Sequence, residues 1–410
     1  MTARLVVIND HAYINGGAAK VAIDSAIGFA RRGVRVDFFA AVGPVEPGLI
    51  EAGVDITLLA QSDVLSASSL TRFGAQWLWN VTAARRLSAL LAGCDPEQTI
   101  VHLHGWAKAL SPAIGPALMR ARLPVVETLH EYYLACPNGG FYDHGAGRDC
   151  GRMAMSPRCV LHNCDSRGYP RKVMRVGRHA LMRHASGLTS LARHVVTLSK
   201  LQRAAMAPYL PGAVFHEISN PIDVADPGPP DGAGATDFLF VGRLSAEKGP
   251  RYFGEAARLA GVTPVFVGDG PERAALEKEF PQARFLGWLP PAGVRDALRR
   301  ARALVFPSVW YEGQPLTIHE ALAQGVPVIV SDLCAGRETV ADGETGFWFD
   351  CGDARSLAAR IELLKDDELA RRLSLAAHAR YWAEPLTLDR HLDAIAAVHA
   401  AARADWDALQ

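Results

Sequence analysis

The 410-residue sequence predicts an α/β protein made of two doubly wound, Rossmann-like domains that face one another across a cleft. Short apolar runs alternate with helical stretches along most of the chain, as expected for parallel strands joined by helices. The alternation stops at residues 227–234, a connector rich in Pro, Gly and Asp, and then begins again. A chain of this length accommodates two domains of about 200 residues each.

The first half opens with a strand, a helix and a second strand. A Gly16-Gly17 turn separates the first apolar run from a helical stretch that ends at Gly33. We assign residues 1–220 to this domain and residues 132–169 to a cysteine-containing insertion within it. The strands that we expect in this half are the apolar runs at residues 5–8, 34–39, 100–103 and 125–129.

The second half repeats the pattern in residues 221–384, which we assign to a second domain. Pro250 stands at the favoured first position of a helix, and Gly268-Asp269-Gly270-Pro271 turns into another helix. Residues 385–410 form one amphipathic helix, which either caps the second domain or crosses back to the first. The expected strands are the apolar runs at residues 238–241, 265–267, 303–306 and 326–330.

Charge and composition exclude several classes of protein. The 43 basic and 43 acidic side chains cancel, so the chain lacks the positive field of a protein that coats nucleic acid. Residues 1–4 lead straight into the first apolar run, without the core of a secretory signal, and the seven cysteines are an odd number. No apolar stretch approaches the roughly 18 residues of a membrane span. We therefore expect a cytoplasmic protein with reduced thiols.

The strongest chemical motif is a pair of carboxylates, Glu312 and Glu320, separated by seven residues after the apolar run at 303–306. A helix that starts near Pro315 places Glu312 in the preceding loop and Glu320 inside the helix. The N-terminus of that helix lies between the two carboxylates and is a natural anion site.

Two cations, Arg243 and Lys248, lie five residues apart in the loop after the strand expected at 238–241. A guanidinium and an ammonium at this spacing suit a pair of phosphates. The three-glycine fingerprint of a nicotinamide enzyme is incomplete both at Gly16-Gly17 and at Gly268-Asp269-Gly270, so we reject a dinucleotide-dependent dehydrogenase. Each glycine turn either approaches an anion or a sugar, or is a tight turn without a ligand.

Together these motifs resemble family 4 of the retaining glycosyltransferases, enzymes of the GT-B architecture that use nucleotide-activated sugars. The resemblance covers nearly the whole chain, and it implies that residues 1–220 bind the acceptor and residues 221–384 bind the nucleotide-sugar donor. It implies hexosyl transfer from a nucleotide-diphosphate sugar to a glycan or lipid-linked acceptor, in cell-surface polysaccharide synthesis, with no further cofactor for catalysis. The other motifs that carry it are His102-Leu103-His104-Gly105, Thr128-Leu129-His130, Gly287, and Asp342-Gly343 with Gly346.

The resemblance also implies roles for single residues. Arg243 and Lys248 match the pair that neutralises the donor diphosphate, and Glu320 matches the glutamate that binds the nucleotide ribose. Glu312 matches the glutamate that faces the donor sugar, and His130 matches the histidine that reaches this sugar from the opposite domain. The remaining donor contacts fall on Gly16, Gly17, Leu286, Gly313, Leu316 and Thr317, and residues 285–288 match the segment that lines the base.

Elementary chemistry agrees with these roles. Breaking the anomeric bond leaves negative charge on the diphosphate, so fixed cations and N–H groups around the phosphates give the largest help. Pro315 has no N–H, so the main-chain contacts at the helix start fall to Leu316 and Thr317. We expect metal-independent transfer with retention, in which a diphosphate oxygen takes the proton of the acceptor.

Other functions remain open at this point. A nucleotide-sugar epimerase and a phosphorylase share the architecture, although a phosphorylase needs a pyridoxal lysine in a much longer chain. A non-catalytic partner protein could keep the nucleotide pocket, but His130, Glu312, Arg243 and Lys248 are all present and argue against it. The sequence does not name the base, the sugar or the acceptor.

Four of the seven cysteines, Cys136, Cys150, Cys159 and Cys164, lie in the insertion, which has little apolar periodicity. Such a segment is commonly stabilised by a disulfide bond or a bound metal ion. Four thiolates can hold a structural zinc ion, with His162 as a substitute ligand. The spacing fits no standard zinc finger. Either these residues bind zinc, or they are reduced cysteines beside the acceptor cleft.

A basic segment follows the insertion. Between Ser166 and His216 there are nine Lys or Arg residues and no Asp or Glu. Arg171, Arg175 and Arg178 fall on one helical face. This face is either solvated or docks on the anionic cytoplasmic surface of a membrane.

Overall fold

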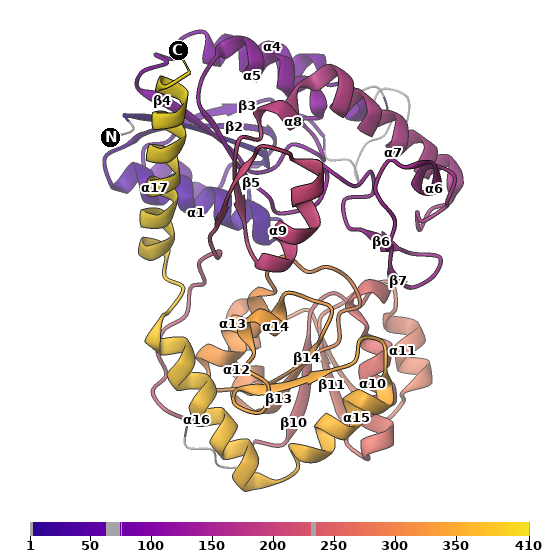
Figure 1. The fold of residues 1–410 in the computed structure, drawn as a ribbon. Coiled ribbons are helices and arrows are strands. Elements are labelled where there is room, and N and C mark those ends of the chain that lie inside the picture. Colours follow the sequence, from indigo (N-terminus) through magenta and orange to yellow (C-terminus); the bar gives the residue numbers. More distant parts are fainter. Residues whose placement is uncertain (1–2, 63–73, 75, 231–234, 410) are drawn as a thin grey trace.

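The structure of the chain, a computed structural model, describes residues 3–62, 74, 76–230 and 235–409. It contains two α/β domains, each built on a parallel sheet (Figure 1). The predicted fold class is therefore confirmed. Part of the predicted connector, residues 231–234, lies outside the described residues.

The first domain is built on a seven-stranded parallel sheet with the order β3-β2-β1-β4-β5-β8-β9. Every predicted strand of this half is present, and β1 pairs with both β2 and β4 in parallel register. The strands are β1 (Arg4–His11), β2 (Arg35–Val42), β3 (Asp55–Leu58), β4 (Thr99–Leu103), β5 (Val125–Thr128), β8 (His194–Thr197) and β9 (Val214–Glu217).

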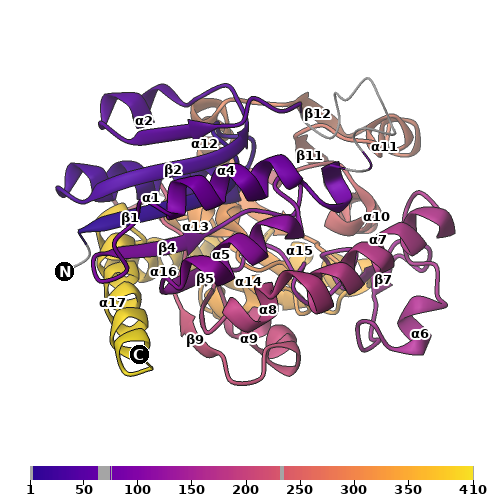
Figure 2. The same cartoon turned by 90° about the horizontal axis from the view of Figure 1, so that it is seen from above.

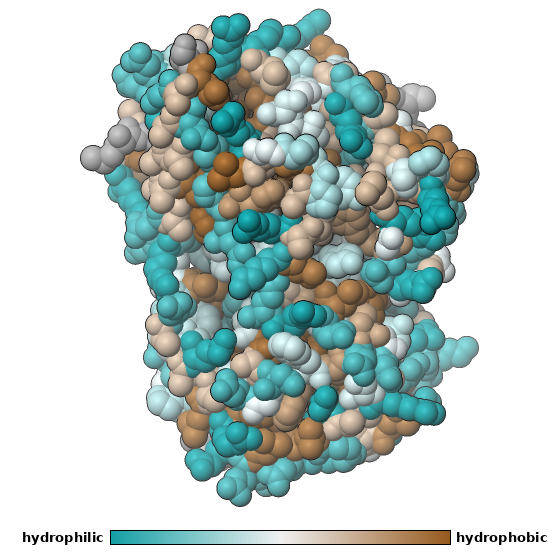
Figure 3. All heavy atoms as spheres, in the orientation of Figure 1, coloured by the Kyte–Doolittle hydropathy of each residue, from teal (hydrophilic) through white to brown (hydrophobic). Residues whose placement is uncertain are grey.

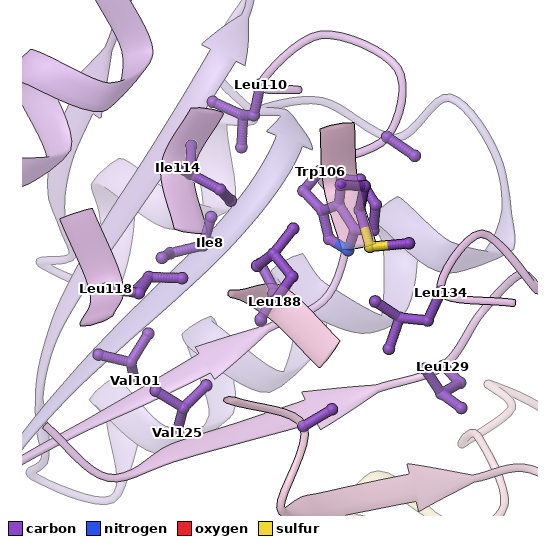
Figure 4. Close-up of a cluster of buried hydrophobic side chains, with 14 of the residues drawn as sticks. Ile8, Val101, Trp106, Leu110, Ile114, Leu118, Val125, Leu129, Leu134 and Leu188 are labelled. Atoms are coloured by element: carbon purple, nitrogen blue, oxygen red, sulfur yellow. The ribbon is translucent and has the colours of Figure 1, made fainter. Parts of the chain in front are cut away.

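Helices cover both faces of this sheet. Val6 and Ile8 of β1 point into one hydrophobic cluster, drawn in part in Figure 4, and Leu5 and Val7 point into another. α4, α5 and α8 lie over the first face, as Figure 2 shows, and α1 lies on the other. The helices of this domain are α1 (Gly17–Arg31), α2 (Pro47–Glu51), α4 (Val81–Leu91), α5 (Gly115–Ala121), α6 (Pro157–Val160), α7 (Tyr169–Leu181), α8 (Leu188–Leu191) and α9 (Lys200–Met206).

The second domain has a six-stranded parallel sheet with the order β12-β11-β10-β13-β14-β15. Its strands are β10 (Asp237–Val241), β11 (Pro264–Val267), β12 (Arg284–Gly287), β13 (Ala301–Phe306), β14 (Val328–Ser331) and β15 (Gly346–Phe349). Its helices are α10 (Pro250–Ala260), α11 (Arg273–Glu279), α12 (Pro291–Arg299), α13 (Leu316–Ala323), α14 (Gly336–Thr339), α15 (Ala354–Leu363) and α16 (Asp367–Ala383).

The last helix, α17 (Leu388–Asp407), leaves the second domain and packs on the first, beside α1 (Figure 1). Leu392, Ile395 and Val398 enter the same hydrophobic cluster as Leu5 and Val7 of β1. Burial of these side chains removes apolar surface of α17 and of the first domain from water, although α17 follows directly on α16 of the second domain. α17 therefore ties the two domains together.

The insertion contains a two-stranded antiparallel hairpin, β6 (Tyr142–Asp143) and β7 (Arg148–Asp149), followed by α6. The basic face predicted on α7 is only partly exposed. Arg175 forms an ion pair with Asp165 at 2.8 Å, and Arg178 is buried and donates to the carbonyl oxygens of Trp77 and Ala107. A helical wheel cannot reveal these contacts, because the partners come from other parts of the chain.

Candidate active site between the two domains

The centre of the candidate site is an ion pair between the loops that follow β10 and β13. Lys248 ends a short 3-10 helix, Ala246–Lys248, and its Nζ contacts Oε1 of Glu312. Ser308 Oγ lies 3.0 Å from the same carboxylate oxygen, and Lys248 Nζ lies 5.4 Å from the centre of the Trp310 ring. Glu312 is 8% exposed, so the loop holds its carboxylate and the ammonium in a largely buried arrangement.

Arg243 lies in the same loop as Lys248 but is exposed, and it has no ion-pair partner in the described part of the chain. Glycines hold this loop against its neighbour. A Cβ at Gly268 would lie 1.9 Å from the carbonyl oxygen of Gly242, and one at Gly270 would lie 2.3 Å from that of Leu244. Close backbone approach thus accounts for both glycines, and the Arg243 guanidinium is left available for an anion.

Two helix N-termini meet across the domain boundary near this ion pair. α1 begins at Gly17, and α13 begins at Leu316 directly after Pro315, as the sequence predicts. A Cβ at Gly17 would lie 3.7 Å from Cδ1 of Leu316, and Gly16 has a φ of 148°, which favours glycine. Both helix starts present unpaired N–H groups and partial positive charge, so an anion between the domains would be stabilised from both sides.

Glu320 lies in the second turn of α13, close to two cations of other helices. Burial raises the pKa of Glu320, and the positive charges of Arg295 and Lys20 oppose this shift. Lys20 belongs to α1 of the first domain, so Glu320 also lies at the domain boundary. A carboxylate in this position can accept hydrogen bonds from ligand hydroxyls.

His130 follows β5 in the first domain and lines a pocket at the carboxyl ends of β1, β4 and β5. Its Nε2 lies 3.0 Å from Nδ1 of His104. Burial, reinforced by His391 and Lys108, lowers the pKa of His130 to about 3, so the ring is neutral at physiological pH. Glu131 next to it forms an ion pair with Lys108 at 3.1 Å.

The segment predicted to line the base lies at the end of β12. Phe285 stacks on Phe266 with ring centres 4.9 Å apart, and Leu286 packs against a hydrophobic cluster of the second domain. Trp288 is 74% exposed. The backbone and Leu286 therefore remain as the surface for a base, whereas the Phe285 ring is used in packing.

Comparison with known proteins assigns the chain to a family. Residues 15–226 match the family model described as Glycosyltransferase Family 4, and residues 231–380 match that of Glycosyl transferases group 1. The chain belongs to Glycosyltransferase Family 4. Similar solved structures cover nearly all of it. Anabaena Alr3699/HepE in complex with UDP and glucose has a TM-score of 0.65 at 17% identity, covering 97% of this chain and 100% of that one. Sucrose-phosphate synthase from Thermosynechococcus elongatus has a TM-score of 0.66 at 17% identity, covering 98% and 99%.

Curated relatives match one part of the chain. The phosphatidyl-myo-inositol mannosyltransferase of Mycobacterium leprae is 40% identical over 146 residues, which are 33% of this chain and 38% of the relative. An Escherichia coli UDP-Gal:alpha-D-GlcNAc-diphosphoundecaprenol alpha-1,3-galactosyltransferase is 31% identical over 151 residues, with the same two shares. The chain thus spans 38% of the length of each of these relatives.

Sequence reasoning missed two residues, Gln202 and Glu127, that the structure places at this family member's site. A Cβ at Gly313 would lie 3.1 Å from Nε2 of Gln202, which donates to the Leu129 carbonyl oxygen at 2.8 Å. Glu127 is buried in β5 and accepts from Trp106 Nε1, and burial raises its pKa to about 8. No local motif marks Gln202, because its role depends on a domain contact. A glutamate inside the apolar run at 125–129 was the signal that could have identified Glu127.

The cysteine cluster does not support the predicted zinc site. No group of three or more His, Cys, Asp or Glu side chains within the described residues is placed to hold a metal ion. The buried Lys172 donates instead to Cys164 Sγ at 3.3 Å and to Cys159 Sγ at 3.5 Å. His162 lies against the Asp143 carboxylate, and Arg152 Nη1 lies 3.7 Å from Cys150 Sγ. An ammonium between two sulfur atoms opposes a metal cation at the same place.

None of the helices in the described ranges is long and apolar enough to cross a membrane.

Proposed function

We propose that the chain is a retaining, metal-independent hexosyltransferase that moves a sugar from a nucleoside diphosphate to a glycan or lipid-linked acceptor. The observation that carries the proposal is the meeting of positive charge at one point. Lys248 contacts Glu312 in the loop before α13, Arg243 is exposed in the same loop as Lys248, and the N-terminus of α13 meets that of α1 at the boundary between the domains. A diphosphate is the ligand whose charge this arrangement balances. UDP in the complex of the structurally similar Anabaena protein supports the proposal.

The charges act most strongly as the anomeric bond breaks. When the bond between the anomeric carbon and the diphosphate oxygen breaks, its electron pair stays on the oxygen. Arg243 and Lys248 stabilise the negative charge that grows there. The acceptor hydroxyl approaches on the face that the diphosphate leaves, and a diphosphate oxygen takes its proton. Because departure and attack share one face, the configuration at the anomeric carbon is retained.

The two sides of the site have separate tasks in this proposal. Glu320 binds the ribose of the nucleotide, and Leu286 with Gly313, Leu316 and Thr317 of the second domain completes the donor site. His130 reaches the donor sugar from the first domain, beside Gly16 and Gly17. Glu312 faces the sugar, and its contact with Lys248 supports a position beside the diphosphate. The neutral ring of His130 contacts a sugar hydroxyl without adding charge.

An acceptor held in a membrane fits the surface around α6 and α7. Leu161 is 76% exposed, Val173 51% and Met174 46%, and Arg167 and Arg171 are exposed beside them. Figure 3 shows hydrophobic surface gathered over α6 and α7 at the right-hand edge of the molecule. Apolar side chains with neighbouring cations are typical of a surface that lies on anionic lipid. We therefore include peripheral contact with the cytoplasmic face of a membrane in the proposal.

Steady-state kinetics test the role of the two cations. A thermal-shift screen of nucleotide sugars first identifies the donor, since a ligand at 100 times its Kd stabilises by about 2.7 kcal/mol. Arg243→Ala and Lys248→Ala should each lose about 100- to 1000-fold in kcat at saturating donor, because their contacts strengthen in the transition state. Glu320→Ala should mainly weaken binding of the free nucleoside diphosphate in calorimetry.

The matched control is Arg251→Ala. Arg251 is exposed, lies three residues after Lys248 in the sequence, and forms an ion pair with Glu279. Its kcat should stay at the wild-type level. A raised KM with unchanged kcat in Arg243→Ala and Lys248→Ala would contradict the leaving-group role. Interconversion of the donor without transfer would indicate an epimerase instead.

A further inference from the structure

Four histidines form a continuous chain from the candidate active site to α17. His130 Nε2 lies 3.0 Å from His104 Nδ1, and the rings of His104 and His102 have their centres 4.2 Å apart. His102 Nδ1 lies 3.1 Å from Nε2 of His399, a residue of α17. His102, His104 and His399 are all buried, and burial lowers the pKa of each. The four histidine rings are therefore neutral, and each has one N–H group and one bare nitrogen.

The surroundings of His104 determine which of its nitrogens carries the proton. Its Nε2 is buried and has no hydrogen-bond partner among the described residues. A proton on Nε2 would leave a buried N–H group unpaired, which is the rarer and more costly kind of unsatisfied group. A proton on Nδ1 instead donates to Nε2 of His130. The favoured arrangement is thus Nδ1–H of His104 pointing at a bare Nε2 of His130.

This arrangement has a direct consequence for the active site. A neutral His130 whose Nε2 accepts from His104 must carry its own proton on Nδ1. No described residue forms a hydrogen bond with Nδ1 of His130, and His130 lines the pocket. We propose that His104 is a positioning residue, which holds His130 in the Nδ1–H tautomer so that it offers a hydrogen-bond donor to an oxygen of the substrate.

The other three histidines hold His104 in place. His102 is fixed at both nitrogens, by Thr128 Oγ1 at 2.8 Å and by His399, and its ring packs against that of His104. The rings of His104 and His130 are stacked, with their centres 5.3 Å apart and their planes inclined by 21°. α17 therefore supplies, through His399, the far end of the support for a residue of the active site.

The tautomer can be measured in the free protein. Two-bond ¹H–¹⁵N spectra of the full chain at pH 7.5, with His130 assigned from a His130→Asn variant, should show the Nδ1–H pattern for His130. His104→Phe keeps an aromatic ring against His102 and His130 but removes the donor, so His130 should shift toward the Nε2–H pattern. His104→Asn keeps an N–H near the position of Nδ1 and should restore the wild-type pattern. His184→Asn, in an exposed histidine, should change nothing.

Kinetics give the second measurement. His104→Phe should lose at least about tenfold in kcat with little change in donor KM, and His104→Asn should recover most of the rate. If His104→Phe does not fold, His104→Leu takes its place. An Nε2–H pattern in the wild type, or a pattern unchanged in His104→Phe, would overturn the inference. The effect on rate rests on the proposed transferase function, but the tautomer does not. A chain inactive with every donor would refute the function while the spectra still decide the role of His104.

Discussion

At the scale of single residues, the candidate site balances charges that a bound donor would rearrange. The Glu312 carboxylate contacts the Lys248 ammonium and lies 3.0 Å from Ser308 Oγ. A diphosphate that reaches Lys248 must share this ammonium with Glu312. The contact of Glu312 with Lys248 and its proposed role of facing the donor sugar should therefore have opposite effects on nucleotide binding and on transfer.

Glu312→Gln separates these effects. The amide removes a negative charge next to the diphosphate, so the free nucleoside diphosphate should bind as tightly as to the wild type or a few times more tightly. The kcat should nevertheless fall at least about tenfold, since the charge that faces the sugar is lost. Calorimetry and steady-state kinetics measure the two values. Glu279→Gln is the control, and weaker nucleotide binding in Glu312→Gln would argue against competition for Lys248.

The buried histidines make stability depend on pH. The folded-state pKa is about 3 for both His130 and His399, below the unfolded value of about 6.5. The unfolded chain therefore binds more protons below pH 6.5, so this stability is complete above pH 6.5 and is lost as the pH falls toward 3. For each such histidine, the free energy of unfolding falls by about 1.4 kcal/mol for each unit by which the pH is lowered in this range.

Urea unfolding of His399→Leu at pH 7.5 and at pH 5.0 measures this contribution. The wild type should lose about 2 kcal/mol more between the two pH values than the variant does, because leucine cannot take up a proton. His184→Leu replaces an exposed histidine and should retain the wild-type dependence. Equal pH dependence in wild type and His399→Leu would mean that folding does not lower the pKa of His399.

At the scale of elements, the contact of α17 with α1 depends on the absence of a side chain. A Cβ at Gly28 of α1 would lie 2.5 Å from Cδ1 of Leu392, which is 1% exposed. Arg32, the residue that follows α1, adds ion pairs to Asp389 at 2.8 Å and Asp393 at 2.7 Å. These pairs are exposed and contribute little, so close packing at Gly28 is the main local determinant.

Gly28→Val should separate the two helices and lower the free energy of unfolding by about 2 kcal/mol, as expected when a packed contact is overfilled. Chemical denaturation measures the change. Gly177→Val is the matched control, since Gly177 is also in a helix but is exposed, with no atom within 4 Å of an added Cβ. A similar loss in both variants would assign the effect to helix propensity rather than to α17.

At the scale of the whole molecule, the proposed membrane contact predicts how the chain distributes between water and lipid. Arg167, Arg171 and Arg183 are exposed and have no ion-pair partner in the described part of the chain. The chain should float with anionic vesicles and not with neutral ones, and salt should weaken the binding. Replacing the three arginines by glutamine should cost roughly 3 kcal/mol, or about a hundredfold in partition.

The control for this experiment is a triple variant with Arg258, Arg371 and Arg372 replaced by glutamine. These arginines are also exposed but belong to the second domain. Flotation of this control should match that of the wild type. Equal binding to anionic and neutral vesicles, or equal losses in both triple variants, would contradict an electrostatic contact through the surface around α6 and α7.

The sequence by itself determined the elements and the loops of the site. Strands such as β1 and β10 are short apolar runs bounded by turns, and α13 starts beside a proline that cannot continue a hydrogen-bond ladder. Arg243 and Lys248 follow one strand and Glu312 another. Because parallel strands end at the same edge of a sheet, these residues could be brought together from sequence alone.

Only the tertiary structure decided which side chains meet across the chain. Lys172 lies in the same basic segment as Arg171, yet it is buried against Cys159 and Cys164, whereas Arg171 faces solvent. The return of α17 brings His399 to His102 across 297 positions. Periodicity and propensity act over a few residues, whereas these contacts are selected by the packing of whole domains, so no local pattern records them.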